Sequence, residues 1–93
     1  MTIFYSDWQM TSDLTPEAAQ RVAGWEVEWK VSWLPERRVS RGQALAGMEL
    51  AEIFSGNHRQ QDAILAVRAH VSAQELGVSL EEARARVLGR RAR

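Results

Sequence analysis

Few side chains in this sequence have the type and spacing that acid–base or metal chemistry requires. His58 and His70 lie 12 positions apart, and neither has the His-Glu-x-x-His spacing or an evident third ligand. We expect His58 at the start of a helix and His70 as a partly buried packing residue within one. Glu49 and Glu52 have the ordinary spacing of carboxylates on a solvated helix face. No metal site is predicted.

The sequence also lacks the short motifs of nucleophilic and nucleotide chemistry. It has no cysteine, no glycine-rich phosphate-binding loop and no serine within a Gly-x-Ser-x-Gly turn. The lack of cysteine excludes disulfides and cysteine-based zinc sites. We therefore expect no catalytic residues and no cofactor, and the sequence predicts a protein that is not an enzyme.

The strongest pattern is a segment of alternating polarity that contains three tryptophans. In WEVEWKVSW, residues 25–33, the odd positions are large and apolar and the even positions are polar. This alternation predicts a half-buried strand, and the β-branched Val27 and Val31 favour extended backbone. The tryptophans also fall at helical spacings with Val22, but Gly24 would interrupt a continuous helix. We therefore prefer the strand.

Two interpretations of this tryptophan face remain open. In the first, the C-terminal helices cover Trp25, Trp29 and Trp33, and the rings belong to the core. In the second, a small chain with few strands leaves one strand edge free to pair with another chain. An exposed ring would then anchor the contact. The second interpretation predicts a homodimer, a different protein partner, or both, with these three tryptophans as interaction residues.

Positive charge is concentrated towards the end of the chain. Residues 1–36 carry two basic and six acidic side chains, whereas residues 37–93 carry ten arginines and six acids. A net charge of zero therefore hides an acidic front and a basic tail. An alternative function follows, that of a small DNA-binding transcriptional regulator whose arginines contact phosphates. The arginines assigned to that role are Arg84, Arg86, Arg90 and Arg91.

The segment SAQELGVSLEEARARVLGRR, residues 72–91, resembles the helix–turn–helix pattern of small bacterial DNA-binding domains. The resemblance rests on Ala73, on Gly77 four positions later, and on a new helix that begins after Ser79. It implies that the last helix contacts DNA. The sequence departs from the pattern at Arg86, where an apolar residue is expected, and at two glutamates that would face phosphates.

The other elements are predicted from residue types at their ends. Residues 2–8 are rich in β-branched and aromatic types and predict a short strand. Thr15 and Pro16 predict the start of a short helix that Gly24 ends. Pro35 ends the long strand and opens a turn. Three helices are then expected, over residues 41–56, 58–77 and 80–91, with an apolar stripe of Ile64, Val67 and Val71 on the second.

These elements predict a single α+β domain over residues 1–93. Its acidic part, residues 1–36, would form strand, helix and strand, and its basic part, residues 37–93, would be helical. We expect a small two-stranded sheet, or one completed by a dimer, packed against about three C-terminal helices. No run of about 18 apolar residues predicts a membrane span, and no signal peptide is evident. A cytoplasmic location is therefore expected.

The segment WEVEWKVSWLPERRVSRGQALAGMELAE, residues 25–52, resembles a motif of small uncharacterised proteins of actinobacteria and their bacteriophages. In those proteins a Trp-rich strand runs into Ser-Trp-Leu-Pro, followed by an Arg, a Gln-Ala pair and a Met-x-Leu-Ala-Glu helix. The matching residues are Ser32, Trp33, Leu34, Pro35, Arg41, Gln43, Ala44, Met48, Leu50, Ala51 and Glu52. The resemblance covers about a third of the chain. It implies a bacterial or bacteriophage protein in the cytoplasm and carries over no site residues.

The expected function is therefore that of a small, non-enzymatic protein-binding protein that acts as a homodimer. If the gene belongs to a bacteriophage or mobile element, a protein of the bacterial host is a further expected partner. Binding to DNA through the C-terminal arginines is the alternative.

Overall fold

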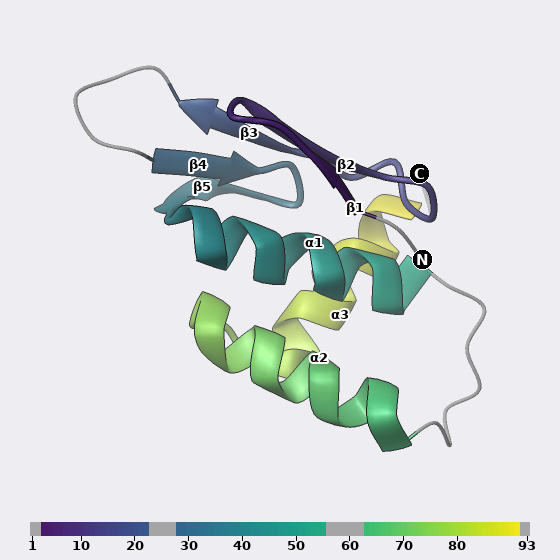
Figure 1. Ribbon diagram of the computed structural model, residues 1–93. Helices are drawn as coiled ribbons and strands as arrows, with labels where there is room; N and C mark the ends of the chain where they lie inside the picture. The colour runs from purple at the N-terminus through teal and green to yellow at the C-terminus, as the bar shows by residue number, and fades with distance from the viewer. Residues whose placement is uncertain (1–2, 23–27, 56–62, 92–93) are drawn as a thin grey trace.

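The computed structural model describes residues 3–22, 28–55 and 63–91 of the chain. In these residues five strands are followed by three helices (Figure 1), and the expected α+β class is confirmed. The strands are β1 (Ile3–Tyr5), β2 (Gln9–Ser12), β3 (Ala19–Val22), β4 (Glu28–Val31) and β5 (Leu34–Val39). The helices are α1 (Arg41–Ser55), α2 (Ala63–Leu76) and α3 (Leu80–Arg91).

The strands form one antiparallel sheet in the order β1-β2-β3-β4-β5, so each strand pairs with its neighbours in sequence. The prediction of a two-stranded sheet is therefore wrong. The strand that carries Trp29 is β4, which pairs with β3 on one side and with β5 on the other. The edges of the described sheet belong to β1 and β5.

Helix α1 is the central element of the molecule. It contacts β2, β3 and β4, and it also contacts α2 and α3. Figure 1 shows α1 between the sheet and α2. Strands and helices contribute to one buried cluster of apolar residues. Gly47 permits the close approach of α1 to the sheet, because a Cβ at this position would lie 3.2 Å from Cγ2 of Val31.

The ends of the helices follow the capping residues in the sequence. The Gln43 amide donates to the Ser40 hydroxyl, and the Ser40 amide donates to the Gln43 side chain, which together make a capping box for α1. Helix α2 ends at Leu76, and the next residue, Gly77, has a φ of 81°, the left-handed conformation that glycine adopts most readily. The Ser79 hydroxyl then accepts the Glu82 amide and begins α3.

The short helix predicted from Thr15 and Pro16 is absent from the described part of this region, where Ala19–Val22 forms β3. The Thr15 hydroxyl does accept a hydrogen bond from the Glu17 amide, as an N-cap would, but a bend at Pro16 and then a strand follow. A helix of about two turns is marginal alone. Pairing with both β2 and β4 outweighs its local propensity.

Besides β3, two further strands were not predicted. β2 is short and polar, QMTS, and gives no pattern over its four residues. β5 contains Pro35, which was expected to open a turn, and its burial pattern has exposed residues at every position between Leu34 and Val39. Proline is tolerated in β5 because this strand is at the edge of the sheet.

The apolar stripe predicted for α2 does not face the core. Ile64, Val67 and Val71 are all more than half exposed. The helix packs instead through a face of mostly small side chains, namely Ala69, Ser72, Ala73 and Leu76, all of which are buried. His70 is exposed rather than partly buried, which corrects its expected packing role. His58 lies outside the described residues.

Candidate interaction surface

The predicted tryptophan contacts do not form a surface in this protomer. Trp29 on β4 is 1% exposed, and Trp33 in the turn before β5 is 2% exposed. The Trp33 indole also donates to the Gly47 carbonyl at 3.1 Å. Of the two open interpretations, the core is therefore correct for these two rings, and a partner cannot reach either ring in the folded chain. Trp25 lies outside the described residues.

Two of the arginines assigned to DNA are already engaged by carboxylates of the same chain. Arg86 makes ion pairs with Glu36 and with Glu82. The Nε of Arg90 donates to both carboxylate oxygens of Glu17, at 2.8 and 2.9 Å. Arg84 is exposed. Arg91 is the last residue of α3, and its side chain lies outside the described part of the structure.

The pKa of Glu36 on β5 is lowered in the folded chain. A backbone hydrogen bond to the Glu36 carboxylate, together with the Arg86 guanidinium, holds the pKa of Glu36 below its usual value. Arg86 of α3 thus binds β5, and Arg90 of α3 binds Glu17 in the segment before β3. This arrangement gives no support to the nucleic-acid alternative.

Large exposed aromatic side chains gather instead in the hairpin of β1 and β2. Phe4, Tyr5 and Trp8 are 56%, 64% and 63% exposed, and we call these three residues the aromatic hairpin. The Arg21 guanidinium lies 4.9 Å from the Trp8 ring centroid, and that of Arg41 lies 5.3 Å from the Tyr5 ring centroid. Cation–π contacts of this kind orient the two rings and leave them accessible, and because an exposed contact stabilises by only about 0.5–1 kcal/mol, a partner can displace it.

The two edges of the sheet differ in their side chains. β5 presents Pro35, Glu36, Arg37 and Arg38, all exposed. Proline and charged residues are the usual devices that prevent an edge strand from pairing with another chain. β1 presents no charge, and two of its three residues are exposed aromatics. Of the two edges, β1 is therefore the one open to another strand.

The backbone of β1 has groups directed away from β2. The Ser6 amide donates to the Gln9 carbonyl, so these two residues form a hydrogen-bonded pair at the turn. Opposed residues in an antiparallel ladder alternate between bonded and non-bonded pairs. Phe4, opposite Thr11, is then the next bonded pair. Ile3 and Tyr5 are consequently the residues whose N–H and C=O point to the free edge.

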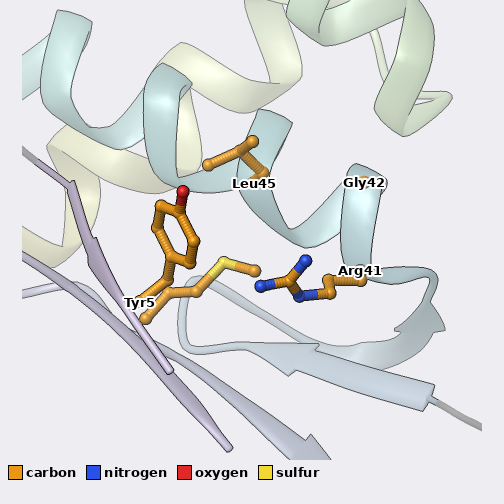
Figure 2. A pocket seen from close by; sticks show the side chains of 5 residues that line it. Tyr5, Arg41, Gly42 and Leu45 are labelled. Atoms are coloured by element: carbon orange, nitrogen blue, oxygen red, sulfur yellow. The ribbon is translucent and has the colours of Figure 1, made fainter. Parts of the chain in front are cut away.

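A groove with two cavities lies between β1 and α1. The first cavity, of about 230 Å³, is lined by Tyr5, Met10, Arg41, Gly42 and Leu45. Figure 2 shows Tyr5 from the sheet and Leu45 and Arg41 from α1 converging on this space. The second cavity, of about 240 Å³, is lined by Ile3, Leu45, Glu49, Glu52 and Arg68. Leu45 is common to both cavities, so they adjoin along α1.

The second cavity contains two carboxylates that the sequence placed on a solvated face. Glu52 is buried, and it accepts a hydrogen bond from the Ser12 hydroxyl. Glu49 is half-buried, and it accepts a hydrogen bond from the Ser72 hydroxyl at 3.0 Å. None of the ion pairs in the described part of the chain involves either carboxylate. Both carboxylates can therefore accept further hydrogen bonds from a donor that enters the cavity.

The described residues hold neither a metal site nor a membrane-spanning helix. The described ranges contain no cluster of three His, Asp or Glu side chains able to hold a metal ion. No helix in them is long and apolar enough to cross a membrane. Comparison with protein-family models, with curated proteins and with solved structures gave no match.

The residues that sequence reasoning missed are those of the aromatic hairpin. The segment TIFYSDW was predicted to be a strand, and β1 lies within it. Its composition gave the strand but not its position in the sheet. The available signal was the absence of any basic residue in the first eight positions, because an unprotected edge lacks the lysine and arginine that protected edges carry.

Proposed function

We propose that this chain is a non-enzymatic protein-binding protein that captures its partner by adding a strand of the partner to β1. The observation that carries this proposal is the contrast between the two sheet edges. β5 is protected by proline and charge, whereas β1 is uncharged and carries exposed aromatic rings. Main-chain hydrogen bonds would supply affinity, and the groove beside α1 would select side chains.

In this proposal the expected homodimer pairs through β1 instead of through the tryptophan strand. β4 cannot pair across a two-fold axis, because β3 and β5 occupy both of its edges. Self-association through a strand therefore uses β1. A host protein as a further partner, and an origin in a bacteriophage or mobile element, remain predictions from the sequence resemblance.

The test uses an array of random heptapeptides and a backbone variant. Tyr5→Pro removes an N–H that points to the free edge, and it leaves the Phe4–Thr11 ladder bonds in place. We expect the wild-type protein to bind peptides rich in β-branched and apolar residues at micromolar concentration. Tyr5→Pro should abolish that binding, while Tyr5→Ala, which keeps the N–H, should only weaken it.

Circular dichroism of both variants provides the control for folding. Equal peptide binding by Tyr5→Pro and the wild-type protein would contradict strand addition at β1. Failure of the wild-type protein to bind any peptide of the array would contradict the function itself.

A further inference from the structure

We infer that the strand that fits β1 is β1 of a second copy, and that Tyr5 of each copy enters the carboxylate-lined cavity of the other. This inference rests on the strand addition proposed above and names its partner. The two strands run antiparallel about a two-fold axis at Phe4. In this register Ile3 of one copy lies opposite Tyr5 of the second copy, and all three residues of β1 are paired.

The backbone of β1 is self-complementary in this register. Ile3 and Tyr5 are the residues whose N–H and C=O face the free edge, as derived above from the bond between Ser6 and Gln9. Placing Ile3 opposite Tyr5 brings two outward-facing residues together on each side of the axis. Each such pair exchanges two hydrogen bonds, so the outward N–H and C=O groups of Ile3 and Tyr5 are all hydrogen-bonded in both copies.

The side chain of Phe4 favours the same arrangement. Phe4 lies on the opposite face of the strand from its neighbours Ile3 and Tyr5, and it is 56% exposed. At the axis it forms a non-hydrogen-bonded pair with Phe4 of the second copy, with a Cα–Cα distance of about 4.5 Å. Cross-strand aromatic pairs at that distance stabilise antiparallel sheets. The axis therefore buries two rings that the protomer leaves exposed.

The cavities match the side chains that the second copy supplies. Ile3 lines the cavity with Glu49 and Glu52, and the residue added beside Ile3 is Tyr5 of the second copy. Its phenol O–H is a hydrogen-bond donor, which carboxylates accept. Tyr5 lines the other cavity, and the residue added beside it is the apolar Ile3 of the second copy. Each cavity thus receives a side chain of suitable chemistry.

Charge and size set the expected strength of this pair. β1 has no charged residue, so two copies meet without like-charge repulsion across the strand pair. The strand is only three residues long. An interface of this kind falls among the small, reversible ones, below roughly 1,200 Å². We therefore expect a dimer that dissociates in the micromolar range.

Sedimentation velocity of the full chain tests the partner and the cavity contact. We expect reversible dimers at tens of micromolar protein and monomers for Tyr5→Pro. Tyr5→Phe removes only the phenol hydroxyl, and it should weaken dimerisation about tenfold. The control is Val71→Ala, which should dimerise as the wild-type protein does, because Val71 is exposed on α2 and lines neither cavity. Unchanged dimerisation of Tyr5→Phe would overturn the contact with the carboxylates.

Cysteine crosslinking tests the register, since the natural chain has no cysteine. Phe4→Cys places two sulfurs at a separation suited to a disulfide, and it should crosslink rapidly under mild oxidation. Gln20→Cys, in β3 inside the sheet, should not crosslink. Faster crosslinking of Ile3→Cys or Tyr5→Cys would overturn the register.

Failure of this inference can be told from failure of the proposed function. A wild-type protein that stays monomeric at millimolar concentration, while its β1 edge binds array peptides, overturns the self-pairing alone. Peptide binding that is insensitive to Tyr5→Pro overturns strand addition as a whole.

Discussion

Trp29 and Trp33 are both buried, but their indole N–H groups have different environments. The N–H of Trp33 donates to the Gly47 carbonyl at 3.1 Å. The N–H of Trp29 is buried and has no hydrogen-bond partner among the described residues. A buried donor without a partner keeps its desolvation cost, whereas a satisfied one does not. The two rings therefore stabilise the fold to different extents.

We expect Trp33→Phe to destabilise the chain more than Trp29→Phe. Both substitutions remove similar buried volume, so they share the cavity cost. Only Trp33→Phe loses a hydrogen bond, while Trp29→Phe removes a buried donor that lacks a partner. The free energies of unfolding from urea titrations should differ by about 1–2 kcal/mol. Equal values for the two variants would contradict the difference in hydrogen bonding.

Gly47 and Gly89 allow a second matched comparison, because both lie within helices. A Cβ at Gly47 would lie 3.2 and 3.3 Å from the methyl groups of the fully buried Val31, whereas a Cβ at Gly89 would meet no atom within 4 Å. Gly89→Ala should raise the free energy of unfolding by about 0.5–1 kcal/mol through helix propensity. Gly47→Ala should lower it by about 1 kcal/mol or more through overpacking. Thermal denaturation of both variants checks that Gly89→Ala raises the stability of the fold and that Gly47→Ala lowers it.

At the scale of elements, helices were easier to predict than strands. α1 is predicted by features of its own sequence, namely the Ser40–Gln43 capping box and a sustained apolar face. β3 has none, and its extended form depends on strands before and after it in the sequence. The interaction surface on β1 was harder to predict than any single strand. Whether Tyr5 is exposed depends on which strand lies at the edge of the sheet, and the lack of basic residues in the first eight positions identifies an unprotected edge only once the strand is known to lie at one.

Helix α3 is held to the rest of the fold by an ion pair with a buried partner. Glu17 is only 3% exposed, and its carboxylate accepts the Arg90 Nε and the Ser32 hydroxyl. We expect Arg90→Ala to lower the free energy of unfolding by about 1–2 kcal/mol. That is less than for a fully buried pair, because the Arg90 side chain is 46% exposed. Arg84→Ala, on the same helix, should change it by less than about 0.5 kcal/mol.

The Glu36–Arg86 contact between β5 and α3 should make stability depend on pH. The pKa of Glu36 is lower in the folded chain than its usual value of 4.5. The backbone hydrogen bond to the Glu36 carboxylate and the Arg86 contact together stabilise the fold above the unfolded pKa, and their contribution is lost as the pH falls through the lowered folded pKa. Glu36→Gln should remove that part of the acid dependence. Urea titrations of both proteins at neutral pH and below the unfolded pKa check this expectation.

At the scale of the whole molecule, the acidic front and the basic tail neutralise one another. Glu17 and Glu36 come from the acidic third of the chain, and their partners Arg90 and Arg86 come from the last helix. The fold therefore joins opposite charges that are far apart in sequence. Phosphate binding would have to compete with these contacts, which are intramolecular and already formed.

We accordingly expect micromolar protein to give no shift of duplex DNA at about 50 mM salt, where phosphate contacts are strong. The triple variant Glu17→Gln, Glu36→Gln and Glu82→Gln removes the carboxylate partners of both arginines and should bind DNA, with an affinity that falls as salt rises. The same variant with Arg86→Gln and Arg90→Gln should lose that binding again. A shift by the wild-type protein that Arg86→Gln and Arg90→Gln abolish would instead show that α3 contacts nucleic acid despite its ion pairs.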